Sequence, residues 1–302
     1  NPSFRWLGDA AVTVATVHIS IGSPSTHSIN RVFLNDRPVK FINSLLRDSA
    51  ERAEPISLTS NESICYRGQM IGGAGFVLTP DERSQMLKME PTSEQVIFPY
   101  LGGEEINTDV FQGHSRYVIN FGKRSLEEAT SWPEALGRVR KLVKPARDAA
   151  RDDTGTGRHG KKYWWQFIDR CDPLYLALEP LSRCLVVANI SKYPMLSFQP
   201  KGRVLSHKVF VFAFEKQTQF AVLQSRVHIM WAWLLSSTMR ESTINYSPTK
   251  CFENFPFPHP DPRRVIPTLE DVGERLYEER ARFMAETSQG LTKTYNAIKD
   301  PA

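Results

Sequence analysis

The sequence lacks the cysteine and histidine spacing that is typical of metal sites. Its seven histidines show neither HxxxH nor HExxH spacing, and its cysteines form no CxxC pair. The pattern argues against a zinc ribbon and against a disulfide framework, so we expect free thiols in a reducing cytoplasm. No metal ligand is predicted. The four cysteines, far apart in the chain, are Cys65, Cys171, Cys184 and Cys251.

Membrane and catalytic signals are also missing. No apolar run reaches the ~18 residues needed to span a bilayer, and the N-terminus has no signal-peptide pattern. We find no Walker motif, no GxSxG and no PD…(D/E)xK triplet. NPSF at residues 1–4 is close to the [DNS]PP[FYW] tetrapeptide of amino-methyltransferases, but Ser3 breaks the pattern. The sequence predicts no catalytic residue in this chain and no membrane contact.

The sequence does contain a local surplus of positive charge. The 302 residues have a net charge of +5. From Arg138 to Arg170, ten Lys and Arg stand against four Asp, and the rest of the chain is close to neutral. A concentrated basic stretch favours a polyanion-binding face over a uniformly basic surface.

Hydrophobic patterning predicts an α/β fold with mixed sheets, packed helices and a helical C-terminal segment. Runs of β-branched or alternating residues predict strands at 10–20, 63–78, 115–122, 183–190 and 207–214. Helical spacing predicts helices that begin near 79 and 133, and further helices over 218–236 and 268–286.

Local signals refine these elements. Thr79, Pro80 and Glu82 fit a capping box that opens the first helix. Lys144 ahead of Pro145 predicts a kink. Gly72, Gly73 and Gly75 predict a bulge or a close backbone approach rather than a cofactor loop. At the end of the chain, Thr268 and Asp271 are expected to open the last helix.

Seven stretches in a fixed order resemble a known family. They are FPYLGGEEIN (98–107), SRYVINFG (115–122), VKPARD (143–148), YWWQF (163–167), FAVLQSRVHIMWA (220–232), YSPTKCFENFPFP (246–258) and GLTKTYN (290–296). In this order they resemble the C-terminal half of the MmeI-like (type IIL) restriction-modification DNA methyltransferases and of related adenine methyltransferases in phage defence. One departure is Ile190 and Tyr193, in a segment that many relatives write as RVSKH.

The resemblance implies a DNA target recognition domain of a SAM-dependent adenine-N6 methyltransferase. In the family, the SAM-binding and catalytic motifs lie upstream of every stretch matched here. We therefore expect no cofactor in this fragment, SAM in the N-terminal part of the parent protein, and no catalysis by the fragment alone. The implied organisation is the last strand of a methyltransferase domain over 1–22, the recognition domain over 23–258 and a C-terminal helical segment over 259–302.

DNA phosphates and bases need different side chains, because phosphate contacts position a protein and base contacts read sequence. The phosphate candidates come from the basic stretch, although each of them also fits a solvated helix face. They are Arg158, Lys161, Lys162, Lys141, Lys144 and Arg147. The rings of YWWQF follow directly, and Trp164 and Trp165 are expected to be buried supports rather than base-stacking residues.

Base readers are expected in two polar segments, 188–208 and 237–247, which the patterning predicts as loops. Glu241, Thr243 and Asn245 are the preferred group, because alternate residues of an extended segment point the same way. Arg, Asn and Glu side chains suit guanine, adenine and cytosine, respectively. The alternative is that these are exposed loop residues that do not read bases. The remaining candidates are Arg240, His207, Lys208 and Lys192.

FENFPFP (252–258) fits either a base-stacking wedge or, by preference, a rigid turn that fixes the recognition domain to the helix at 218–236. Trp231 and Trp233 are expected in the core.

Three functions remain open on the sequence. The first is a DNA recognition module, whose partners are double-stranded DNA and the methyltransferase domain of the same parent chain. The second is a protein-interaction module, in which the charged helix 268–286 docks another subunit of a defence system. The third, an RNA-binding domain, rests only on the basic and aromatic stretch, since no RNP-type or KH motif supports it.

Overall fold

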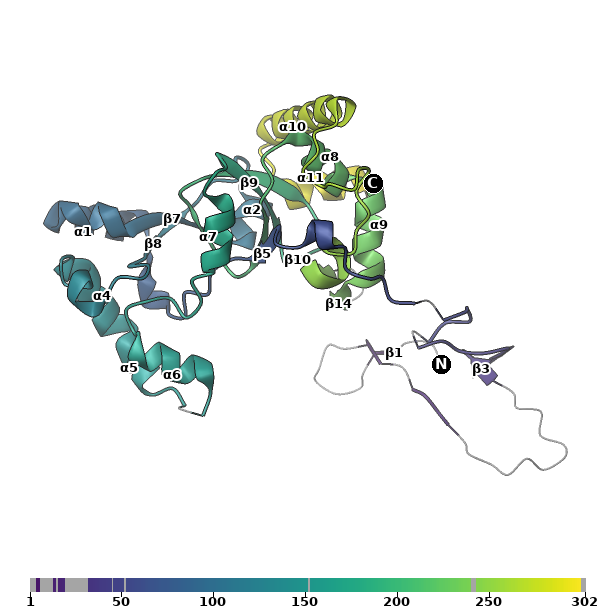
Figure 1. Ribbon diagram of the computed structural model, residues 1–302, viewed down its shortest axis with the longest axis horizontal. Coiled ribbons are helices and arrows are strands. Elements are labelled where there is room, and N and C mark those ends of the chain that lie inside the picture. The colour runs from purple at the N-terminus through teal and green to yellow at the C-terminus, as the bar shows by residue number, and fades with distance from the viewer. Residues whose placement is uncertain are drawn as a thin grey trace. The chain divides into compact units, whose positions relative to one another are not determined.

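The computed structural model describes residues 4–5, 13–14, 16–19, 32–44, 46–51, 53–151, 153–239 and 243–299 (Figure 1). The chain divides into two compact units. Unit 1 comprises residues 1–56 and 239–242, and unit 2 comprises residues 57–238 and 243–302.

Unit 1 contains two short antiparallel strand pairs. β1 (Phe4–Arg5) pairs with β2 (Thr13–Val14), and β3 (Val32–Leu34) pairs with β4 (Arg37–Val39). The second pair is a hairpin whose turn residues, Asn35 and Asp36, have φ of 53° and 63°. Positive φ at both central residues is the requirement of a type I′ turn, which Asn and Asp tolerate best after glycine.

The predicted buried strand over 10–20 is wrong for residues 16–19. These residues have no regular structure and are exposed, with Val17 at 62% and Ile19 at 83% of full exposure. A β-branched run is buried only where other elements cover it, and among the described residues none does so here. Residues 10–12, 15 and 20 lie outside the described part of the chain.

Three small sheets organise unit 2, which confirms the mixed α/β class. The central sheet has the order β11-β9-β13-β5 and is antiparallel throughout. Its strands are β11 (Leu196–Pro200), β9 (Arg183–Ala188), β13 (Val209–Phe212) and β5 (Cys65–Arg67). A second, mixed sheet consists of β12 (Val204–Leu205), β7 (Ile97–Leu101), β8 (Arg116–Ile119) and β6 (Val77–Leu78). The third consists of β10 (Ile190–Ser191), β15 (Thr243–Asn245) and β14 (Ser237–Met239).

The single strand predicted over 63–78 is instead divided between two sheets. β5 and β6 belong to different sheets, and a 3₁₀ turn, η2 (Ala74–Phe76), precedes β6. The glycines between them mark a close approach, as predicted. Gly72 has φ of 68°, and a Cβ on Gly75 would lie 2.5 Å from the side chain of Leu142. The strand ends there because the chain turns to pack against the helix that carries Leu142.

Two helix signals in the sequence are confirmed in detail. At the start of α1 (Pro80–Met89), Thr79 Oγ1 accepts from Glu82 N at 3.2 Å, and the Glu82 carboxylate accepts from Thr79 N at 2.8 Å. The kink also occurs, since α4 (Pro133–Leu142) ends just before α5 (Lys144–Asp148).

The helix predicted over 218–236 is two helices, α8 (Gln217–Gln224) and α9 (Arg226–Leu235). Ser225 separates them, with ψ of 155°, and its hydroxyl accepts from His228 N and caps α9. The other helices are α2 (Gly103–Thr108), α3 (Leu126–Ala129), α6 (Gly155–Lys162), α7 (Asp172–Leu178), α10 (Pro267–Thr287) and α11 (Leu291–Lys299). The chain also contains the 3₁₀ helices η1 (Thr59–Asn61) and η3 (Pro91–Val96) and the short π-helix η4 (Pro248–Phe252).

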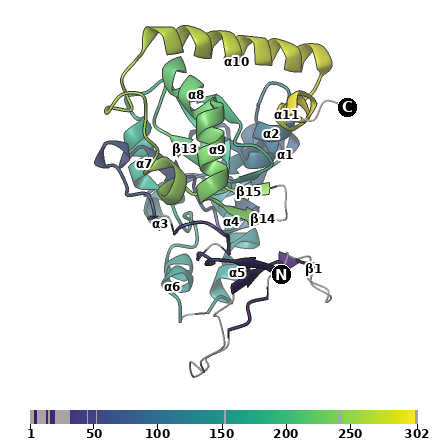
Figure 2. The same ribbon diagram turned by 90° about the vertical axis from the view of Figure 1, so that its right-hand side faces the viewer.

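α10 confirms the predicted C-terminal helix but not its predicted start. Neither Thr268 nor Asp271 caps it, because Ile266 occupies the N-cap without a side-chain bond. The carboxylate of Glu270 instead accepts from the backbone N–H groups of Gln217 and Thr218, at 3.1 and 2.7 Å. A residue of α10 thereby satisfies the open amides at the start of α8, and the two helices pack together (Figure 2).

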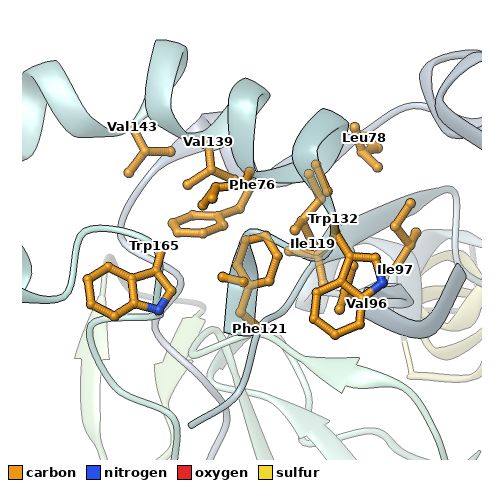
Figure 3. Packing of buried hydrophobic residues seen from close by; sticks show 14 of the residues in the cluster. Phe76, Leu78, Val96, Ile97, Ile119, Phe121, Trp132, Val139, Val143 and Trp165 are labelled. Carbon is orange, nitrogen blue, oxygen red and sulfur yellow. The ribbon is translucent and has the colours of Figure 1, made fainter. Parts of the chain in front are cut away.

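Three apolar clusters form the core of unit 2. One lies under α4 and contains Phe76, Phe121, Trp132 and Val139 (Figure 3). The other two lie against opposite faces of β9, with Leu185 and Val187 in one and Cys184 and Val186 in the other. β9 is therefore buried on both faces, and its sequence is apolar without alternation for that reason.

Two helix glycines give a test of the packing of α10 on α8. A Cβ on Gly273 would lie 2.3 Å from Gln217 O, whereas a Cβ on Gly137 in α4 would meet nothing within 4 Å. We expect Gly273→Ala to lower the free energy of unfolding by about 1–3 kcal/mol through overpacking. Gly137→Ala, the matched control, should raise it by about 0.5–1 kcal/mol through helix propensity. Urea unfolding measures both, and equal stabilisation by the two changes would contradict the close packing.

Candidate nucleic-acid interface

The basic helix α6 presents cations at the surface of unit 2. Thr154 caps it, with its hydroxyl accepting from Gly157 N at 3.0 Å. Arg158 and Lys162 are exposed, and Lys161 is half-buried. The Lys162 ammonium also lies 5.2 Å from the centre of the Tyr163 ring. The helix thus holds three of the predicted phosphate contacts on one short element.

Two further phosphate candidates belong to α4 and α5, which precede α6. Lys141 is exposed at the end of α4. Lys144 is half-buried, and its ammonium forms an ion pair with Asp148 at 2.6 Å, one helical turn along α5. A helix pair of this kind, four residues apart, contributes only ~0.3–0.5 kcal/mol.

Arg147, predicted to bind phosphate, has a structural position instead. Its side chain is buried, at 4% exposure. The guanidinium donates to the carbonyls of Tyr163, Gln166 and Ile71 at 3.1, 2.7 and 2.9 Å, and to Gly72 at 3.4 Å. Burial lowers the pKa of Arg147 to about 10. The guanidinium is committed to backbone carbonyls and is not available to a phosphate.

The sequence contained a signal for this position. Arg147 lies four residues after Val143, which is 1% exposed, and residues four apart share a helix face. Arg147 therefore continues the apolar face that includes Val143, and not the solvent face.

The rings after α6 are buried, as predicted. Trp164 and Trp165 are 6% and 7% exposed. Trp165 Nε1 donates to the carbonyl of Arg124 at 2.9 Å, and its ring lies in the cluster under α4 (Figure 3). Both rings therefore belong to the core next to the end of α6 and are not exposed for stacking on bases.

The two segments predicted to read bases come together as neighbouring strands. β10 and β15 pair antiparallel, with Ile190 opposite Asn245 and Ser191 opposite Ile244. Ile244 is fully buried, so Thr243 and Asn245, both half-buried, share the other face of the strand. Asn245 Nδ2 donates to Ser237 Oγ at 3.4 Å. Arg240 and Glu241 lie outside the described residues.

The segment 188–208 is not the polar loop that the patterning predicted. It contains β10, β11 and β12, and most of its side chains are buried because β11 is a strand of the central sheet. Lys208 remains exposed. Its carbonyl accepts from Asn189 N at 3.0 Å, and the Asn189 carbonyl accepts from Tyr246 N at 2.8 Å. Asn189, absent from the candidates above, therefore connects Lys208 to the end of β15.

The last two candidates for base reading, His207 and Lys192, lie in different surroundings from each other. His207 is half-buried, and burial, followed by the charges of Arg67 and Lys208, lowers its pKa. Its carbonyl accepts from Arg67 Nε at 2.9 Å. Arg67 is an exposed cation that the sequence reasoning missed, and its contact with residue 207 depends on the pairing of β5 with β13. Lys192 Nζ instead donates to Asn296 of α11 at 3.3 Å.

His228 fixes Tyr246, the residue that follows β15. Its ring is fully buried, with Nε2 3.0 Å from the Tyr246 hydroxyl and Nδ1 2.7 Å from the Leu223 carbonyl. Because a carbonyl only accepts, Nδ1 donates and Nε2 accepts in the neutral ring. Burial lowers the pKa of His228 to about 4.

FENFPFP packs as the rigid turn that the sequence favoured. Phe255 is 2% exposed and meets the His228 ring edge-on, with the ring centres 4.9 Å apart. Trp231 is half-buried against the apolar cluster that contains Leu185 and Val187, and its indole N–H donates to Asn254 Oδ1 at 3.1 Å. Trp233 is also half-buried. The block is thereby attached to α9.

Protonation of His228 should make folding depend on pH. The folded pKa of about 4 is lower than an ordinary unfolded value of about 6.5. The unfolded chain therefore binds the proton first as pH falls, and stability is lost through this window. From pH 7.5 to pH 5 we expect this histidine to cost about 2 kcal/mol.

Urea unfolding at the two pH values tests this. His228→Gln should remove about 2 kcal/mol of the pH-dependent loss of stability between these pH values. An unaltered pH dependence in His228→Gln would be evidence against the buried neutral ring.

In the described ranges, no group of three His, Cys, Asp or Glu side chains is placed to hold a metal ion. The same ranges contain no helix that is long and apolar enough to cross a membrane.

A family model described as the MmeI target recognition domain matches residues 50–259, and the chain belongs to this family. A search of curated proteins finds no match.

Among solved structures, the Type IIL restriction-modification enzyme MmeI in complex with DNA has a similar fold. The TM-score is 0.62 at 19% sequence identity. The match covers 88% of this chain and 34% of the MmeI chain, so this chain spans about a third of that enzyme.

Proposed function

We propose that this chain is the DNA sequence-recognition module of a SAM-dependent adenine-N6 DNA methyltransferase that serves restriction-modification or phage defence. Membership of the MmeI target recognition domain family carries the proposal. The likeness to a structure solved with DNA supports it. SAM and the methyl-transfer residues would belong to another part of the parent protein, and that methyltransferase domain and duplex DNA would be the partners.

In this proposal α6 and the end of α4 hold the DNA backbone. The exposed cations Arg158, Lys162 and Lys141, together with Lys161 and Lys144, stand on helices whose other side is fixed by buried rings and by Arg147. A rigid cationic surface suits phosphates, which carry charge but no sequence information.

The pair β10–β15 would read bases. Thr243 and Asn245 point to one side of a short strand whose central residue is buried. An asparagine side chain can form two hydrogen bonds with adenine. Lys208 and His207 lie next to the same strand pair through Asn189 and extend the surface. Arg240 and Glu241 remain candidates from the sequence alone.

The salt dependence of duplex binding tests the backbone contacts. For Lys161→Gln/Lys162→Gln, we expect the log–log salt slope of the binding constant to fall in magnitude by up to about 1.8, at ~0.9 for each lost phosphate contact. Affinity should fall for all sequences alike. Filter binding of the whole chain between ~50 and ~200 mM salt measures the slope.

The matched control is Lys293→Gln, an exposed lysine on α11 at the opposite side of unit 2 from α6 (Figures 1 and 2). Its slope should equal that of the unmodified chain. Equal slopes in the control and in the Lys161/Lys162 variant would remove α6 from the interface.

Selection from a random duplex library tests base reading. We expect Asn245→Ala to relax the preferred sequence at one position, with a discrimination loss of about 1–3 kcal/mol, and to leave the salt slope unchanged. Lys162→Gln should do the reverse and keep the sequence preference. An unchanged preference in Asn245→Ala would exclude this side chain from readout.

A protein partner is a second candidate function for α10. Its residues Val272, Leu276 and Phe283 are 44%, 41% and 38% exposed, and they favour contact with another subunit of a defence system. Charge reversal at Lys161 and Lys162 separates the two functions, because docking through α10 should survive it.

A further inference from the structure

A pocket of about 400 Å³ lies among α9, α10 and α11, formed by a part of unit 2 that the proposed DNA contacts do not use. Ile229, Leu276, Phe283 and Ile298 supply apolar walls. Leu276, Phe283 and Ile298 are 41%, 38% and 61% exposed and stand at the rim. Arg280, Thr294 and Tyr295 are buried and belong to its inner lining.

Arg280 is a buried cation without a counter-ion. It is 5% exposed, and among the described residues no carboxylate forms an ion pair with it. Its Nη1 has only two long contacts, each 3.5 Å, to Gln224 Oε1 and the Tyr295 hydroxyl. Its Nη2 has no hydrogen-bond partner in the part of the chain that the structure describes. The guanidinium lies over the rings of Phe220 and Tyr277, which soften but do not neutralise its charge.

Thr294 adds a second unsatisfied group to the same pocket. It is 1% exposed, and its hydroxyl has no hydrogen-bond partner among the described side chains and backbone groups. A buried polar group without a partner is destabilising, and a buried charge without one is more so. Arg280 on α10 and Thr294 on α11 thus bring two unsatisfied hydrogen-bond donors to the lining of one pocket. This is the arrangement expected of an anion site.

The other charged groups of the pocket limit the anion. Arg282 forms an ion pair with Glu279, Arg226 is exposed, and Glu286 is an additional acid. The lining thus contains one buried, uncommitted positive charge, and two glutamates at its edge disfavour a dianion. A planar monoanion fits the guanidinium fork, and the apolar walls require an apolar body.

We propose that this pocket binds a carboxylate carried on an apolar group, with Arg280 and Thr294 donating to the carboxylate. The carboxylate can belong to a free monocarboxylic acid or to a glutamate between apolar residues of a protein segment. The proposal is independent of DNA recognition, because none of the residues involved is a candidate DNA contact.

Thermal unfolding and calorimetry of the whole chain test the site with sodium hexanoate, hexanamide, inorganic phosphate and a blocked tripeptide with glutamate between two leucines. At ~10 mM we expect hexanoate or the tripeptide to raise the Tm by about 3 °C, and hexanamide and phosphate to leave it unchanged. Binding of hexanoate assigns a free acid, and binding of the tripeptide alone assigns a protein segment.

Arg280→Met should weaken binding at least tenfold while keeping the Tm of the ligand-free chain, since an apolar side chain suits a buried site better than an unpaired charge. Thr294→Val should weaken binding several-fold, and it decides the matter if Arg280→Met does not fold. Arg282→Met, the matched control at the rim, should bind as the unmodified chain does.

Three results would each overturn the proposal. They are absence of binding by both carboxylates, equal effects of hexanoate and hexanamide, and binding that persists in both Arg280→Met and Thr294→Val. Stronger binding of phosphate than of hexanoate would also refute a carboxylate site.

Discussion

The hydrogen bonds of one buried guanidinium hold the basic surface of this protein in place. Arg147 joins α5 to the backbone at residues 71 and 72 and to the chain just after α6. Burial lowers the pKa of this cation, and the four carbonyls around it, together with the Phe76 ring 5.4 Å from the guanidinium carbon, offset the loss of hydration. Because buried Arg147 fixes α5 and the end of α6, Lys144, Lys161 and Lys162 on these two helices are held in fixed positions relative to one another.

A second constraint places the polar strand pair. β9 is covered on both faces, so its direction is fixed, and the chain leaves it at Asn189 directly into β10. On the other side, His228 and Phe255 hold Tyr246 immediately after β15. A strand pair of only two residue pairs would be marginal by itself. Its geometry is imposed by the packed residues at both ends.

Signals from neighbouring residues in the sequence predicted most of the local features of the fold, such as helix caps, kinks and close backbone approaches. The capping box at Thr79, the kink ahead of Pro145 and the close approach at Gly75 needed only neighbouring residues, and all three occur. Several of the predictions that were wrong involve distant partners. Nothing near residue 196 indicates that β11 joins the central sheet, and the contact of Arg67 with residue 207 requires the pairing of β5 with β13. The pairing of Ile190 with Asn245 is equally non-local, so the two polar segments were predicted as separate loops.

The alternation along β15 has an evolutionary consequence. Ile244 contributes to the core, whereas the residues on each side of it do not belong to any apolar cluster. Mutations at 243 and 245 therefore change the chemistry of the surface with little effect on the free energy of unfolding. A mutation at 244 disturbs core packing and lowers that free energy. A lineage with this strand can drift through many different surface pairs while it keeps one fold. Within three consecutive residues, one position is fixed by the core and its two neighbours are free to vary.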